Sequence, residues 1–124
     1  MFFCFSPIDA KGPSIRFSKR QIKDYDRKTF DVTIGDSLTT LIGSAVTIKC
    51  SAIGNPSPQL SWTKSGSPIR KTVRIKPGNN TLKIFGATWS DTGQYECTAV
   101  NAGGSDRKSS FLKFIRKWTL FVKS

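Results

Sequence analysis

Histidine is absent from this 124-residue chain, and only three cysteines are present. The lack of histidine removes the most common general base and the most common metal ligand. Three cysteines are too few for a zinc site made of cysteine alone, and no histidine completes a mixed one. No stretch approaches the about 18 apolar residues that identify a membrane-spanning helix. We therefore expect no catalytic residues, no cofactor, no metal site and no membrane span.

Acidic residues are also scarce. The chain has 8 Asp and Glu against 20 Lys and Arg, which gives a formal net charge of +12. Hydrophobic residues make up 37% of the chain, enough for a compact core and too many for a disordered chain. The length corresponds to one domain. These numbers favour a basic domain that binds a partner.

The two ends of the chain differ in composition from its middle. Residues 1–27 are densely charged, and we expect a basic, poorly ordered segment with room for one short edge strand around Ile15 and Phe17. The first residues do not form a complete signal peptide, and we expect no structural role for Cys4. Residues 116–124 form a basic-aromatic tail. The folded domain is expected over residues 28–115.

Within residues 28–115, short runs alternate apolar and polar residues, with turn-forming residues between them. This period of two, repeated about every ten residues, predicts an antiparallel β-sandwich. The runs with this pattern are Val46–Cys50, Leu60–Trp62, Val73–Ile75, Leu82–Ile84, Tyr95–Ala99 and Leu112–Phe114.

Two cysteines stand on the apolar side of their runs. Cys50 is followed by Trp62 on another inward position, and Cys97 is preceded by Tyr95 after the sequence Asp91-Thr92-Gly93. Cysteine, tryptophan and then Asp-x-Gly-x-Tyr-x-Cys, in this order, resembles the immunoglobulin domain. The short segment after Trp62 and the Asn101-Ala102-Gly103-Gly104 turn resemble the intermediate set of that family.

The resemblance implies an all-β, Greek-key sandwich of two antiparallel sheets joined by a Cys50–Cys97 disulfide. It places Trp62, Tyr95 and Leu82 in the core. The Tyr95 hydroxyl is expected to bind the backbone just upstream. The family pattern also implies an ion pair between Asp91 and Arg74.

The expected disulfide indicates the outside of the cell, as a secreted or cell-surface protein, because disulfides persist in oxidising compartments. Asn79-Asn80-Thr81 fits the N-glycosylation acceptor pattern and agrees with that location. Thr33-Ile34-Gly35 and Lys83-Ile84-Phe85-Gly86 also resemble the modules of secreted ADAMTS-like matrix proteins. That resemblance implies association with the extracellular matrix.

No acidic residue occurs between Asp36 and Asp91. If the apolar residues point inward, four basic residues point outward from three strands of one sheet: Lys49, Arg74, Lys76 and Lys83. One interpretation is a solvated surface without a dedicated ligand. A second is a face that binds heparin-like, sulfated glycosaminoglycan. An acidic protein partner is a third, and nucleic acid is disfavoured because only Phe85 offers an aromatic platform among these residues.

We therefore expect a non-catalytic, extracellular binding or adhesion module whose partner is a protein, a sulfated glycosaminoglycan or both. Two alternatives remain. One is a structural module of an intracellular, muscle-type protein, and the other is a homophilic cell-adhesion receptor domain. Trp89 is either an exposed interface anchor or a side chain folded over the end of the sandwich.

Overall fold

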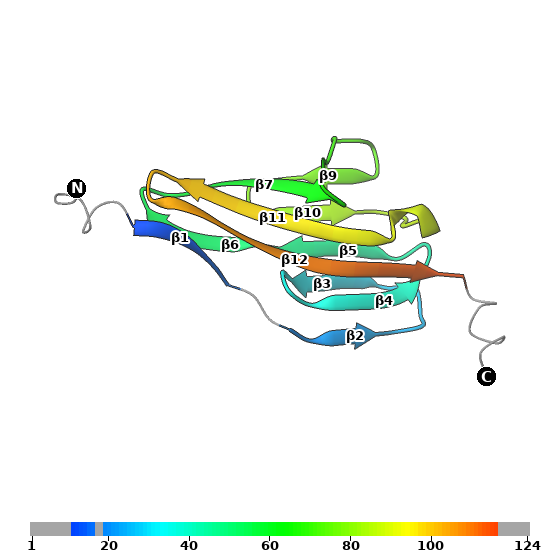
Figure 1. Cartoon of the computed structure of the whole chain (residues 1–124). Coiled ribbons are helices and arrows are strands. Elements are labelled where there is room, and N and C mark those ends of the chain that lie inside the picture. Colours follow the sequence, from blue (N-terminus) through cyan, green and yellow to red (C-terminus); the bar gives the residue numbers. More distant parts are fainter. Residues whose placement is uncertain (1–10, 17–18, 117–124) are drawn as a thin grey trace.

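The computed structural model describes residues 11–16 and 19–116, which form two stacked sheets and a two-stranded ribbon (Figure 1). In the larger sheet, the strands follow the order β2 (Gln21–Lys23), β4 (Ser37–Leu41), β12 (Gly104–Ile115), β11 (Gly93–Asn101), β7 (Gln59–Lys64) and β8 (Ser67–Pro68). In the smaller sheet, the order is β3 (Thr29–Thr33), β5 (Ala45–Lys49), β10 (Thr81–Ile84) and β9 (Ile75–Pro77). The ribbon joins β1 (Lys11–Arg16) to β6 (Ser51–Asn55).

The all-β sandwich is confirmed, but its sheets are mixed rather than purely antiparallel. Strand β3 runs parallel to β5, and β4 runs parallel to both β2 and β12. The parallel pairs all involve strands that precede Ala45. These strands pass alternately between the two sheets, so no hairpin imposes an antiparallel direction on them.

The N-terminal segment contributes more structure than its composition indicates. Strand β1 pairs with β6, with Ile15 opposite Ala52, and β2 forms an edge of the larger sheet. Ile15 is 4% exposed and belongs to the core. Ile15 buries apolar surface there, and β1 satisfies the hydrogen bonds of β6. The expectation of a basic, poorly ordered segment over residues 1–27 stays a prediction. The domain limits at residues 28 and 115 stay predictions.

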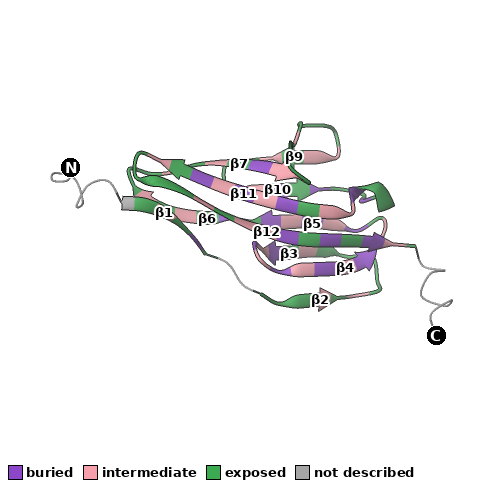
Figure 2. Cartoon of the chain, viewed as in Figure 1, coloured by how far each residue is buried: buried purple, intermediate pink, exposed green. Residues whose placement is uncertain are grey.

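The core lies between the two sheets, and buried and exposed residues alternate along the central strands (Figure 2). The disulfide between Cys50 and Cys97 is confirmed, with a Cα–Cα distance of 6.5 Å. Trp62 is 5% exposed and stands directly opposite Cys97 on the neighbouring strand. Leu82 and Tyr95 are buried in the same cluster. The described residues include no helix long and apolar enough to cross a membrane.

Candidate functional site

The outer surface of the smaller sheet carries three of the basic residues that the sequence singled out. We call the exposed side of β5, β10 and β9 with Lys49, Lys83 and Lys76 the basic face. Along β10, Leu82 and Ile84 are fully buried, so Lys83 between them points to solvent. Lys83 stands directly opposite Lys76 of β9. Because directly opposite Cβ atoms are about 5 Å apart, the two ammonium groups share one patch of surface.

Neither of these two lysines has an acidic partner among the residues that the structure describes: the ion pairs found there involve other side chains. Lys76 Nζ lies 3.5 Å from the Thr72 carbonyl oxygen, a long and weak contact. Like charges directly opposite each other destabilise a sheet. An anionic group bound between the two ammonium groups would remove that repulsion.

Lys49, by contrast, has an acidic neighbour. Its Nζ lies 3.9 Å from Asp31 Oδ2, and both side chains are more than half exposed. Such a surface pair is worth about 0–1 kcal/mol and is screened by salt. Asp31 lies before the acid-free stretch in sequence, and only the parallel pairing of β3 with β5 brings it to this surface.

Arg74 belongs to a different site. Its Nη1 donates to Asp91 Oδ2 at 2.9 Å and to the carbonyl oxygens of Phe85 and Gly86 at 3.2 and 3.3 Å. These contacts fix the guanidinium at the corner between β10 and β11. The structure therefore separates Arg74 from the three lysines of the basic face and gives it a structural role.

That corner is built around Asp91, whose side chain is 6% exposed. Burial by itself would raise the pKa of the Asp91 carboxyl, but the Arg74 guanidinium and the Thr88 N–H hold that pKa below its usual range. The Tyr95 hydroxyl donates to the Asp91 carbonyl oxygen at 2.5 Å. Burial, together with the nearby Asp91 charge, raises the pKa of the Tyr95 phenol. The corner thus holds a fixed ion pair and a protonated phenol.

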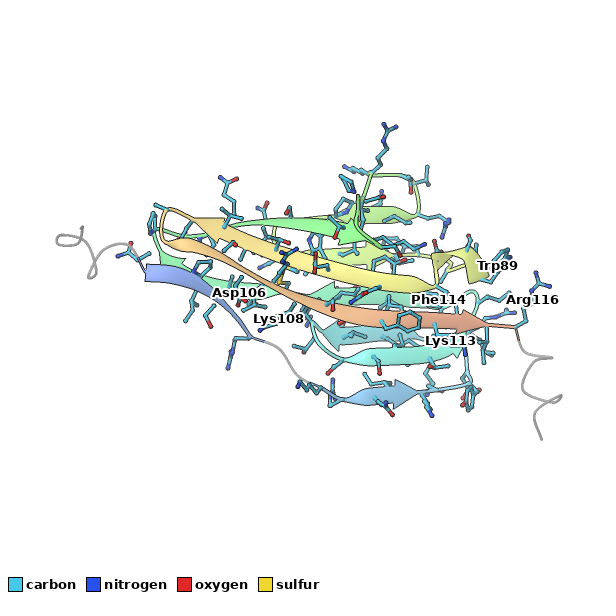
Figure 3. All side chains as sticks on the ribbon, viewed as in Figure 1. Trp89, Asp106, Lys108, Lys113, Phe114 and Arg116 are labelled. Carbon is cyan, nitrogen blue, oxygen red and sulfur yellow. A yellow bond between two sulfur atoms is a disulfide. The ribbon has the colours of Figure 1, made fainter. Side chains whose placement is uncertain are left out.

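Two further residues from the sequence predictions lie at opposite ends of the β9–β10 hairpin. Asn79 is exposed on the turn between the two strands. Trp89 begins the 3-10 turn η2 (Trp89–Asp91) and is 62% exposed, at the end of the molecule where β12 ends (Figure 3). It does not fold over the sandwich, and a role as an interface anchor stays a prediction. Cys4 and residues 117–124 of the tail lie outside the described residues.

Sequence patterns did not single out the pairing of Arg20 with Asp36. The buried Asp36 carboxylate accepts hydrogen bonds from Arg20 Nη2 at 2.8 Å, from the Arg20 N–H at 3.0 Å and from the Thr33 N–H at 3.3 Å. It thereby ties the segment before β2 to the turn between β3 and β4. The Gly-Asp dipeptide of that turn is an ordinary turn signal and does not identify the distant partner.

The immunoglobulin I-set domain profile matches residues 28–114. Contactin-1 of Gallus gallus is 43% identical over 67 residues, which cover 54% of this chain and 7% of the relative. The titin homolog of Caenorhabditis elegans is 38% identical over 89 residues and covers 68% of this chain. The solved titin M3 domain superimposes with a TM-score of 0.59 at 25% identity, covering 86% of this chain and 99% of that domain.

The chain therefore spans a small fraction of the length of the curated relatives it matches. Relatives of the contactin and hemicentin type are extracellular or on the cell surface, whereas titin relatives are intracellular. The narrower resemblance to ADAMTS-like matrix modules has no support among these proteins.

Proposed function

The chain belongs to the immunoglobulin I-set family, and we propose that it is a non-catalytic, extracellular binding module that holds sulfated glycosaminoglycan on its basic face. The observation that carries this proposal is the pair of opposed lysines, Lys76 and Lys83. Their ammonium groups point to solvent from neighbouring strands and lack acidic partners among the described residues. A sulfate group placed between them would contact both.

The binding would be electrostatic and weak at each contact. Sulfate and ammonium groups meet at a water-exposed surface, where the Debye length is about 8 Å at physiological ionic strength. A chain of regularly spaced sulfates would extend the contact from the central pair toward Lys49. Lys49 stands two residue pairs further along β5 and retains Asp31 as a competitor. Affinity is therefore expected to fall steeply as salt is added.

Heparin-affinity chromatography of two matched double variants tests the proposal. The first replaces Lys76 and Lys83 by glutamate. The control replaces Lys23 and Lys113 by glutamate. These two lysines are exposed and lie on either side of Thr39 on the larger sheet, about 10 Å apart. Both variants change the net charge equally, and Lys113 points away from β12 into solvent (Figure 3).

We expect the Lys76 and Lys83 variant to elute at much lower salt than the Lys23 and Lys113 variant. Elution of the two at the same salt concentration would mean that net charge alone retains the protein on heparin. The basic face would then be a solvated surface, and the module a basic spacer.

The second candidate role, a structural module inside the cell, is supported by the similarity to titin relatives. The two roles differ in the redox state that the protein meets. The two roles are separated by counting free thiols, before and after reduction, on protein isolated from its native source. Cys50 and Cys97 react with the thiol reagent only after reduction if the protein is extracellular. They react without reduction if it is cytosolic.

A further inference from the structure

The β9–β10 hairpin ends in a two-residue turn with Asn79 and Asn80 at its tip. Pro77 and Leu82 form the last ladder pair, and the Gly78 N–H donates to the Thr81 carbonyl oxygen at 2.7 Å. Both asparagines are exposed. The turn therefore presents two carboxamide side chains to solvent at one end of the smaller sheet.

The backbone of this turn is held from two sides. Trp62 Nε1 donates to the Gly78 carbonyl oxygen at 3.1 Å, and the Cys50 N–H donates to the Asn80 carbonyl oxygen at 2.9 Å. The core tryptophan and a disulfide cysteine thus fix the turn, although its tip is exposed. A group attached to a side chain at the tip would extend from a fixed base without disturbing these hydrogen bonds.

Asn79-Asn80-Thr81 is the one usable acceptor triplet in the sequence. Asn55 is followed by proline, which blocks the pattern, and Asn101 is followed by alanine and glycine. The triplet thus coincides with a turn whose asparagine is exposed and whose backbone is anchored.

A groove runs from this turn toward β6 and β7. Its lining includes Ser51, Ser57, Pro58, Gln59 and Leu60 in addition to the two asparagines. Hydroxyl and amide groups lie beside the carbon surfaces of a proline and a leucine. An N-acetylated amino sugar has the matching chemistry, with hydroxyls and an amide on its rim and an apolar C–H face.

We infer that Asn79 is an N-glycosylation site and that its first N-acetylglucosamine lies in this groove. The inference rests on the extracellular location in the proposed function. The donor is a polyprenyl-pyrophosphate-linked oligosaccharide. Asn79 Nδ2 forms a bond to the anomeric carbon, the bond from that carbon to the pyrophosphate oxygen breaks, and Nδ2 loses a proton. Nothing is oxidised or reduced, and polyprenyl pyrophosphate leaves.

The glycan and the basic face occupy different surfaces. Lys76 and Lys83 lie two residue pairs from the turn, about 7 Å along the strands at ~3.3 Å per residue, on the outer side of the sheet. The groove extends toward β6 and β7, and neither Lys76 nor Lys83 lines it. A sugar in the groove therefore leaves this lysine pair open to an anionic polymer.

The test is expression of the full chain in animal cells behind a secretion leader, with cell lysate and medium both analysed by electrophoresis. We expect a slower band that collapses on treatment with peptide N-glycosidase. Asn79→Gln and Thr81→Ala are expected to migrate with the collapsed band. The control Asn80→Gln makes the same one-methylene change at the neighbouring asparagine but keeps the acceptor triplet, so it is expected to stay modified.

The inference would be overturned if the unaltered chain migrated at the same position as Asn79→Gln. That result would have to hold in both lysate and medium, and both with and without the glycosidase. Failure of the polyanion proposal is a separate result, because Asn79→Gln is expected to elute from heparin at the same salt as the unaltered chain. The lysine variants are expected to keep the slower band.

Nuclear magnetic resonance tests the position of the first sugar. The glycosylated chain, trimmed to that sugar, is compared with the same chain made in bacteria and refolded with its disulfide. We expect the backbone amide signals of Ser57 and Gln59 to shift, and that of Ser109 on the larger sheet to stay. Unchanged signals for Ser57 and Gln59 would place the sugar outside the groove.

Discussion

Lys83 stands directly opposite Lys76 across the β9–β10 hairpin, and in the described part of the chain neither ammonium group is paired with a carboxylate. The buried neighbours Leu82 and Ile84 fix the direction in which Lys83 points. The two charges therefore cannot separate by turning one side chain into the core. Repulsion between the two ammonium groups reduces the stability of the sheet, and a bound anion would remove this repulsion.

Replacing Lys83 by threonine is expected to stabilise the domain by about 0.2–1 kcal/mol at low salt, because the repulsion by Lys76 is removed. The gain should shrink at 1 M salt, where the Debye length is about 3 Å. Urea denaturation at both salt concentrations measures it. Lys113→Thr is the control, since Lys113 is an exposed strand residue opposite Thr39. Equal gains for both variants would attribute the effect to strand propensity instead of charge.

The Asp91 and Arg74 pair is expected to show a coupling of about 0.5–3 kcal/mol in a double-mutant cycle of alanine substitutions. The value should lie toward the lower end, because the Arg74 side chain is 40% exposed and solvent screens the pair. A coupling of zero would show that the two residues act independently.

The same pair predicts a pH dependence. The pKa of Asp91 is lowered in the folded protein, so its contribution is complete above its unfolded pKa of about 4. It is lost as the pH falls through the folded-state value. The stability difference between the unaltered chain and Asp91→Ala should therefore narrow below about pH 4, as measured by urea denaturation across a pH series.

Trp62→Ala is expected to cost about 3–5 kcal/mol, because it leaves a large cavity beside the disulfide. It also removes the hydrogen bond to Gly78 that holds the β9–β10 turn. Trp89→Ala is the matched control: Trp89 is 62% exposed, and its removal should change stability by less than about 0.5 kcal/mol. Thermal and urea unfolding compare the two. Similar losses for both would contradict the assignment of Trp62 as the core tryptophan.

Asp36→Ala is expected to cost at least about 1–3 kcal/mol, because backbone N–H groups of Arg20 and Thr33 lose their buried acceptor. Amide hydrogen exchange should become faster in β2, which the Arg20 contact positions. Asp31→Ala is the control, since Asp31 is an exposed aspartate on β3. It should leave both the free energy of unfolding and the amide exchange of β2 nearly unchanged. Unaltered exchange in β2 would mean that the Asp36 contacts do not hold the N-terminal segment.

Much of this domain follows from short stretches of sequence. The alternation around Cys50, Trp62 and Cys97 places all three on inward positions, because successive side chains of an extended strand point to opposite faces. That local rule is enough to predict the core side of each run. Resemblance to immunoglobulin domains then supplied the pairing of the cysteines, and it also indicated the Arg74 and Asp91 pair.

The tertiary structure decided which strands lie side by side. Asp31 reaches Lys49 only because β3 pairs in parallel with β5, and Ile15 is buried only because β1 pairs with β6. The groove beside Asn79 likewise joins residues of β6 and β7 to a turn of another sheet. Alternation is a property of the backbone within a few residues, whereas these neighbours are separated in sequence. Their pairing is selected by the apolar surface and the edge hydrogen bonds that the closed sandwich buries as a whole.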